Sequence, residues 1–282
     1  MVNEAQGSTV RRRRLGAEMK ALRERAGLDQ ADAAKELECS TSKVSRLEKG
    51  QGRAFFKVIE MDRLLTLYGV TDTGERAKLH EIRRAASEIG WWEQAQYEEV
   101  LPSGLGVYVG LEFDARQVQA WEPLLVPGLV QTPAYARAVF AGDPDVDRHV
   151  DVRLKRQERL TAERSPLELW AIVDEFALRR PMGGPDVMRE QLAALAKAAA
   201  QPNITIQVYP ADKPHHPGLV GAFSILNFGP LDPQTGYVDS PAGNTFLERD
   251  SQIRALTHTF GLLKAGALDI PESAALLRQM AA

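Results

Sequence analysis

Hydroxyl and cationic side chains in the segment from Cys39 to Gly50, CSTSKVSRLEKG, are spaced so that a helix gathers them on one face. At 100° per residue, Val44 and Leu47 lie on the same side of that helix. The opposite side carries Ser42, Ser45, Arg46 and Lys49, with Thr41 and Lys43 at its flanks. Arginine pairs bidentately with guanine, and serine or threonine bonds to base edges or phosphates. The face therefore suits a DNA major groove, and the alternative is an ordinary solvated surface.

The flanking sequence predicts the short helices that would position this face. Residues 11–26, RRRRLGAEMKALRERA, carry Leu15, Met19 and Leu22 on one stripe, and Gly27 ends that helix. Asp29 caps a second helix over 30–37, and Ser40 caps the third, which Gly50 stops after Lys49. A fourth apolar helix follows over 55–68. Two capped helices joined by a short turn are typical of a DNA-binding motif.

Residues 15–68 resemble the XRE-type helix-turn-helix of the phage lambda/434 repressor group, chiefly through LRERAGLDQADAAKELECSTSKVSRLEKG. The resemblance implies a compact helical domain with residues 41–49 as its recognition helix. The positions that match base-reading residues are Thr41, Ser42 and Arg46, and Ser45 is a further candidate. Gln30 matches a phosphate-contacting glutamine, while Arg23 and Glu48 match an internal ion pair. Glu38 departs from the glycine that this family often has in the turn, and a left-handed Glu38 would carry roughly 1 kcal/mol of strain.

Further candidates for phosphate contact surround this motif. Cations and capping hydroxyls bind phosphates without reading sequence. We place Arg11, Arg12, Arg13, Arg14, Ser40, Lys43 and Lys49 in this group. The alternative for the four arginines is a solvated helix start. Cys39, the single cysteine, is interpreted as a small half-buried hydrophobic residue and not as a redox sensor.

Length and charge divide the 282 residues into two parts. Residues 1–70 hold 14 Lys/Arg and 10 Asp/Glu, a net charge of +4, so the remaining 21 basic and 28 acidic residues give −7. We expect a helix-turn-helix domain over 1–70, a helical, aromatic-rich connector over 71–106 and an effector domain over 107–282. The sequence has no apolar run of membrane-spanning length and no signal core, so we expect a cytoplasmic, nucleoid-associated protein.

The pattern after residue 106 mixes strands and helices. The clearest strand is NITIQVYP (203–210), and others are predicted within 119–132, 167–175, 222–228, 236–240 and 244–248. Helices are predicted over 132–140, 147–163, 185–200, 250–264 and 272–280, whereas 102–106 reads as a loop. The fold class is therefore multi-domain: an all-α helix-turn-helix domain followed by an α+β domain.

Catalytic signatures are absent from this second part of the sequence. It has no nucleophile elbow, no P-loop and no dinucleotide-binding glycine motif. His215 and His216 would diverge in an extended loop, so we expect no metal site. Asp174 and Glu175 form either an acid pair or a helix cap, the simpler interpretation. We expect neither an enzyme nor a cofactor.

Five segments of this part resemble the body of an actinobacterial regulator family, the WhiJ-like or antitoxin-like XRE proteins. They are GWWEQAQYEEVLPSG, EPLLVPGLVQTPAYARAVF, VRLKRQERL, LRRPMGGPDVMREQLAAL and NITIQVYP. The resemblance implies a transcriptional regulator whose C-terminal domain receives a signal, often from a small partner protein encoded beside it.

Three hypotheses stay open from the sequence. The first is a sequence-specific DNA-binding regulator, a homodimer on double-stranded DNA, with a partner protein as its input. The second is an antitoxin-like module that chiefly sequesters a small toxic partner and binds DNA for autoregulation. The third is an enzyme tethered to DNA, which would require titratable groups that converge in a cleft. Within the first hypothesis the alternative input is a small molecule, which a closed apolar pocket near Trp91, Trp92 and Trp121 would favour.

Overall fold

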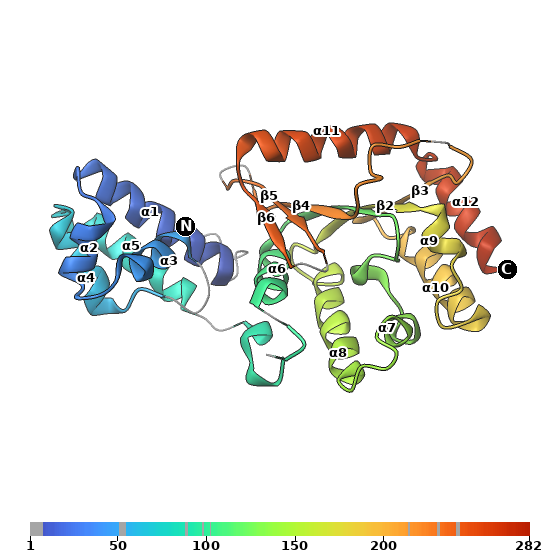
Figure 1. Ribbon diagram of the computed structural model, residues 1–282, viewed down its shortest axis with the longest axis horizontal. Coiled ribbons are helices and arrows are strands. Elements are labelled where there is room, and N and C mark those ends of the chain that lie inside the picture. Colours follow the sequence, from blue (N-terminus) through green and yellow to red (C-terminus); the bar gives the residue numbers. More distant parts are fainter. Residues whose placement is uncertain are drawn as a thin grey trace. The chain divides into compact units, whose positions relative to one another are not determined.

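The computed structural model describes residues 8–50, 55–87, 90–97, 99–101, 103–213, 215–229, 232–240 and 243–282. This part of the chain forms two compact units (Figure 1). We call residues up to 95 together with 109–114 the head, and residues 96–108 together with 115–282 the body.

The head is built from helices, as predicted. Its main elements are α1 (Ser8–Arg25), α2 (Gln30–Glu36), α3 (Thr41–Lys49), α4 (Val58–Leu67) and α5 (Thr73–Ala86). Two short 3₁₀ turns follow, η1 (Trp91–Glu93) and η2 (Ala95–Tyr97), and then α6 (Ser103–Asp114), whose second half belongs to the head. The all-α class of the N-terminal domain is confirmed.

One apolar core holds the head helices together. It contains the stripe predicted for the first helix (Leu15, Met19, Leu22), the small residues Ala33 and Ala34, and residues from the later helices: Leu37, Val44, Leu47, Phe56, Met61, Leu64, Leu65, Tyr68, Val70 and Leu79. Cys39 is half-buried against this core, as predicted. Leu79 belongs to α5, so the head extends past the predicted boundary at residue 70.

The body contains one mixed sheet of six strands. These are β1 (Gln117–Glu122), β2 (Glu168–Asp174), β3 (Ile204–Tyr209), β4 (Phe223–Asn227), β5 (Thr235–Val238) and β6 (Thr245–Leu247). Their order is β3-β2-β1-β4-β5-β6. The first three are parallel, with Trp121 opposite Ile172, and β4 runs antiparallel to β1 with Trp121 opposite Phe223. The predicted α+β class is confirmed.

Helices cover both faces of the sheet (Figure 1). They are α7 (Pro133–Val139), α8 (Val146–Gln157), α9 (Glu175–Arg179), α10 (Pro185–Ala198), α11 (Asp250–Gly266) and α12 (Ile270–Ala281), with the 3₁₀ turns η3 (Gly128–Val130) and η4 (Glu158–Leu160). Helix α11 lies along one face and α7 and α8 lie on the other. Under α11 the core contains Trp121, Ile172, Tyr209, Phe223, Ile225, Phe260 and Leu263.

The predicted loop over 102–106 is wrong, because residues 103–106 belong to α6. Helix α6 places Tyr108, Val109 and Leu111 in buried positions, and burial of these apolar side chains stabilises the helix. Gly104 lies where a Cβ atom would come within 2.5 Å of the Asn244 amide. That glycine therefore marks a close contact and not a turn.

Candidate nucleic-acid interface

Both helices of the predicted motif have the caps that the sequence indicates. The Asp29 side chain accepts hydrogen bonds from the backbone N–H groups of Ala31 and Asp32 and forms a capping box at the start of α2. The Ser40 Oγ accepts a hydrogen bond from the Lys43 N–H, 3.2 Å away, at the start of α3. These caps satisfy backbone donors that have no partner within the helix. Gly50 ends α3 in a left-handed conformation, with φ +58°.

The turn between α2 and α3 contains the strained residue that the sequence predicts. Glu38 has φ +52°, which costs a non-glycine residue roughly 1 kcal/mol. Arg63 of α4 stabilises the same turn, because its guanidinium donates to the Glu36 carboxylate at 3.0 Å, to the Glu36 carbonyl and to the Glu38 carboxylate at 3.3 Å. The turn therefore keeps its geometry without the glycine.

Helix α3 has two chemically different sides. Val44, Leu47 and Glu48 are buried in the head. The predicted base-reading residues Thr41, Ser42 and Arg46 are exposed, and Ser45 is half-buried. The side chains of these four residues have no hydrogen bond or ion pair to any other described residue. Their donors and acceptors are therefore available to an external partner, which is what base recognition requires; their role in DNA contact stays a prediction.

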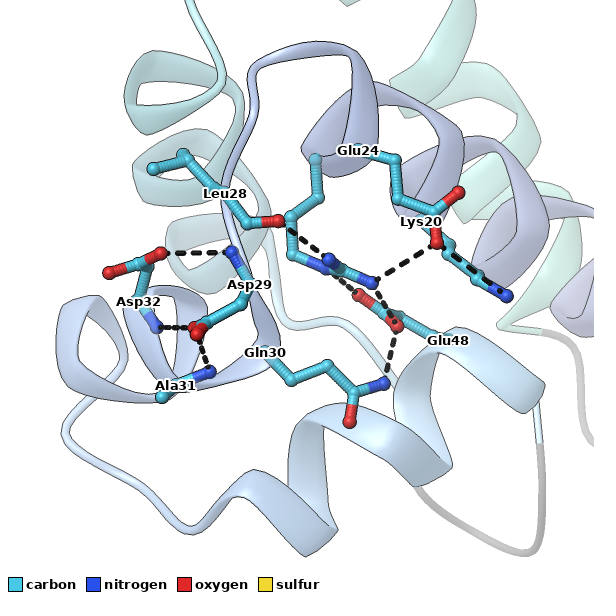
Figure 2. A network of polar contacts seen from close by, with 9 residues as sticks. Lys20, Glu24, Leu28, Asp29, Gln30, Ala31, Asp32 and Glu48 are labelled. Carbon is cyan, nitrogen blue, oxygen red and sulfur yellow. Dashed lines mark hydrogen bonds and ion pairs between the residues drawn. The ribbon is translucent and has the colours of Figure 1, made fainter.

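A buried network fixes the orientation of α3 against α1 and α2 (Figure 2). The Arg23 guanidinium donates to the Glu48 carboxylate through Nε at 2.6 Å and Nη2 at 3.1 Å, and to the Leu28 carbonyl through Nη1 at 2.7 Å. The hydrogen bond to Glu48 raises the pKa of Arg23. The Gln30 amide donates to Oε2 of the same carboxylate at 2.8 Å, the oxygen that also accepts from Arg23 Nη2. The ion pair that the family resemblance implied is thus present, and it includes Gln30.

The residues around α3 that are predicted to contact phosphates differ in their exposure and in their partners within the head. Lys49 is exposed, and its side chain has no ion pair among the described residues. Lys43 is half-buried and lies 2.6 Å from the Glu60 carboxylate. Gln30 and Ser40 lie at the helix starts and already make the intramolecular bonds described above. All four roles stay predictions; Lys49 needs no rearrangement to meet a phosphate, whereas Lys43 would exchange one acceptor for another.

The arginines at the start of α1 differ from one another in exposure and in partners. Arg14 is exposed and Arg13 is half-buried, with burial lowering its pKa. The Arg12 guanidinium lies 2.8 Å from the Glu93 carboxylate and also donates to the Ala86 carbonyl at 3.0 Å. We therefore correct the interpretation of Arg12, because its donors are directed into the head and its side chain is only 11% exposed. The side chain of Arg11 lies outside the described residues.

The titratable residues singled out in the body have local structural partners. Asp174 caps α9, since its Oδ1 accepts the Phe176 N–H at 2.8 Å, which confirms the simpler interpretation. Glu175 pairs with Arg179 and accepts the Ala211 N–H at 2.8 Å. Within the described residues, no three His, Cys, Asp or Glu side chains form a group that could hold a metal.

The tryptophans considered as a pocket wall lie in two separate clusters. Trp92 packs against Trp91 and against Phe113 of α6, with ring centroids 5.8 and 4.9 Å apart, within the head. Trp121 is completely buried in the sheet core of the body. Each tryptophan cluster is thus part of the packing of its own unit.

Glu122, the last residue of β1, is expected to make the stability of the body depend on pH. Burial raises the pKa of its carboxyl group to about 7, Arg156 opposes that shift and Asp239 adds to it. An unfolded glutamate has a pKa near 4.3, so the bound proton stabilises the fold below that value, and this contribution is lost as the pH rises through about 7. A pKa difference of this size corresponds to roughly 3.7 kcal/mol in a fully buried group, and solvent reaches the half-buried Glu122 side chain. Glu122→Gln should therefore be neutral at pH 4 and stabilise the body by about 1–2 kcal/mol at pH 8. Urea unfolding at both pH values measures this, and equal effects at both would contradict it.

Comparison with family models gives two matches. Residues 14–79 match a model described as a helix-turn-helix domain. Residues 105–279, more than half of the chain, match a model described as a domain of unknown function, DUF5753. The search of curated proteins and the search of solved structures each found no match. The head is therefore a helix-turn-helix domain of the DNA-binding type. Among the described helices, none combines the length and the apolar character needed to cross a membrane.

Proposed function

The chain belongs to the family of the domain of unknown function DUF5753, and we propose that it is a sequence-specific transcriptional regulator with a DNA-binding head and a signal-receiving body. The observation that supports this most directly is the exposed side of α3. It combines hydroxyl groups with a guanidinium that has no partner among the described residues, on a helix mounted rigidly by the Arg23–Glu48 network. Rigid mounting matters because base readout requires donors at fixed positions in the groove.

The regulator we propose is an XRE-type protein that binds DNA as a homodimer in the cytoplasm, associated with the nucleoid. One recognition helix reads too few base pairs for high specificity, so two heads would bind half-sites roughly 34 Å apart. The sequence resemblance to WhiJ-like and antitoxin-like regulators of actinobacteria supports a small partner protein as the input to the body. We propose that the body acts by binding and not by catalysis, since Asp174 and Glu175 at the end of β2 serve as a helix cap and an ion-pair partner.

Replacing Arg46 by alanine tests the docking of α3. Loss of one bidentate contact is expected to cost roughly 1–3 kcal/mol at a single base position and to relax selectivity there. The measurement is selection of bound duplexes from a random library by the full-length wild type and the variant, followed by titration of the selected sites. An unchanged preference at every position would show that α3 is not the reading helix.

Lys49→Ala is the matched control, because Lys49 lies on the same exposed side of α3 and is assigned to phosphate contact. It should weaken binding to all sequences alike and reduce the slope of log affinity against log salt by about 0.9. The antitoxin-like alternative predicts a different result: a chain of residues 96–282, which contains the whole body, would relieve growth inhibition caused by the partner protein.

A further inference from the structure

Four large apolar side chains are exposed at one edge of the body sheet. Strands β1, β2 and β3 are parallel, so the segments that follow them emerge at the same edge. Leu124 follows β1, Phe176 follows β2, and Leu219 and Val220 follow β3, with exposed fractions of 63%, 64%, 66% and 96%. We call these four residues the strand-end patch. Large apolar side chains exposed near one another on a protein surface mark interaction sites.

The turn that carries Leu219 and Val220 is built to hold them outward. It is closed by a hydrogen bond from the Gly221 N–H to the Gly218 carbonyl, 3.3 Å away. Gly221 has φ +131°, a conformation that only glycine adopts easily. Central turn positions favour Gly, Pro, Asn, Asp and Ser, so leucine and valine at the apex are not explained by the needs of the turn.

Buried contacts fix this turn to the ends of β1 and β2. The Trp121 indole donates to the Gly218 carbonyl at 2.9 Å, and a Cβ atom at Gly218 would lie 2.3 Å from the same indole nitrogen. His216 is buried, with its Nε2 atom 3.5 Å from the Asp174 carboxylate and its ring centroid 5.0 Å from that of Trp121. Since Asp174 precedes Phe176 by two residues and Trp121 precedes Leu124 by three, these contacts hold the turn with Leu219 and Val220 at the edge where β1 and β2 end.

The shape and the charge of the strand-end patch indicate which kind of partner it binds. Small molecules bind in concave sites, whereas Val220 is almost fully exposed on a protruding turn, so a macromolecular surface suits the patch better. The strand-end segments 123–127, 175–184 and 210–222 carry three basic residues, Arg179, Arg180 and Lys213, against two acidic ones, a net charge of +1. The rest of residues 71–282 therefore has a net charge of −8. Arg179 pairs with Glu175, so the positive charge near the patch comes from Arg180 and Lys213, against Asp212. This positive charge favours an acidic segment over the same patch on a second copy of the chain.

We propose that the strand-end patch docks a segment of a partner protein that combines apolar side chains with flanking acidic residues. This inference rests on the proposed function, because it assigns to the signal-receiving body the surface that receives the signal. Apolar side chains of the partner would cover Leu219 and Val220, and its carboxylates would face the exposed Arg180 and Lys213. The Lys213 ammonium group donates to the Gly266 carbonyl at 2.6 Å and would gain a second acceptor.

A library of random 12-residue peptides displayed on phage, selected on the immobilised full-length protein, tests the docking surface. Enriched peptides are expected to contain at least two large apolar residues and a net negative charge. A labelled consensus peptide should bind at least about tenfold more weakly to the double variant Leu219→Asp/Val220→Asp, and high salt should weaken its binding to wild type. Leu262→Asp, at an exposed apolar position on α11, is the matched control and should bind like wild type.

Four results would overturn the proposal: no enrichment, enrichment of peptides without acidic residues, equal binding by the double variant, or loss of binding by the α11 control as well. Sedimentation velocity gives a further outcome, since dissociation of a wild-type dimer by the double variant would assign the patch to self-association. Circular dichroism melting shows whether the variant folds, and Val220→Ser is the milder replacement if it does not. Operator selection by the head is measured separately, so failure of the patch and failure of the regulator proposal are distinguishable.

Discussion

Replacing Arg23 by methionine is expected to destabilise the head by about 3–5 kcal/mol, because it leaves the Glu48 carboxylate buried without its cationic partner. Both side chains are almost completely buried, at 7% and 3% exposure. Gln30 alone would then donate to that carboxylate, and the Leu28 carbonyl would lose its donor. Truncation of an exposed ion pair would have little effect by comparison.

Hydrogen exchange in the intact chain is the suitable measurement, since it reports on the head amides separately from those of the body. Backbone amides of α1 and α3 should exchange faster in the Arg23→Met protein, while those of β1 to β3 should not change. Lys20→Met is the matched control, because Lys20 is an exposed residue of the same helix in an i,i+4 pair with Glu24. Equal protection in the two variants would contradict a structural role for Arg23.

The double variant Arg23→Met/Glu48→Met separates the stability of the head from the positioning of α3. Replacing both members of a buried ion pair by apolar residues of similar volume is often neutral or stabilising, so protection should largely return. The network also fixes the angle between α1, α2 and α3 through directed hydrogen bonds, and methionine cannot supply these. A double variant that recovers stability should therefore still select its operator less sharply than wild type.

The parts of the head that could be predicted from the sequence depend on local interactions. The side chains of Asp29 and Ser40 cap their helices by accepting hydrogen bonds from backbone N–H groups two or three residues away. Gly50 ends α3 because the chain adopts a left-handed conformation there. Such contacts need no knowledge of the remaining fold. The exposed side of α3 follows from helical periodicity in the same way, because the burial of Val44 and Leu47 fixes which residues point outward.

Contacts between distant segments explain what the sequence could not show. Arg12 pairs with Glu93, 81 residues further along the chain, and an arginine within a basic run gives no signal of that partner. Helix α6 was hidden by its glycines, one of which lies against Asn244 from the other end of the body. The strand-end patch depends on three parallel strands meeting at one edge, so its residues are scattered over nearly 100 positions in the sequence.

A second large effect is expected at Gly16, where α1 crosses the end of α3. A Cβ atom at Gly16 would lie 2.4 Å from the Glu48 carbonyl oxygen and 2.6 Å from that of Leu47. Both atoms belong to the backbone of α3 and cannot rotate away, so α3 itself must move. Gly16→Val should destabilise the head by about 3 kcal/mol, the upper end of the usual cost of overpacking.

Whether alanine at position 16 lowers or raises the stability of the head shows whether helix packing or helix propensity dominates there. Alanine in place of glycine in a helix interior ordinarily stabilises by about 0.5–1 kcal/mol, and Gly261 of α11, with open space around it, should behave in that way. Gly16→Ala is expected to destabilise instead, with exchange of α3 amides as the measurement. Ala17→Val, at an exposed position on the same helix, should cost about 0.5 kcal/mol and controls for the β-branched side chain. A stabilising Gly16→Ala would mean that α1 and α3 lie further apart than this crossing requires. The orientation of the exposed side of α3 would then depend on the Arg23–Glu48 network alone.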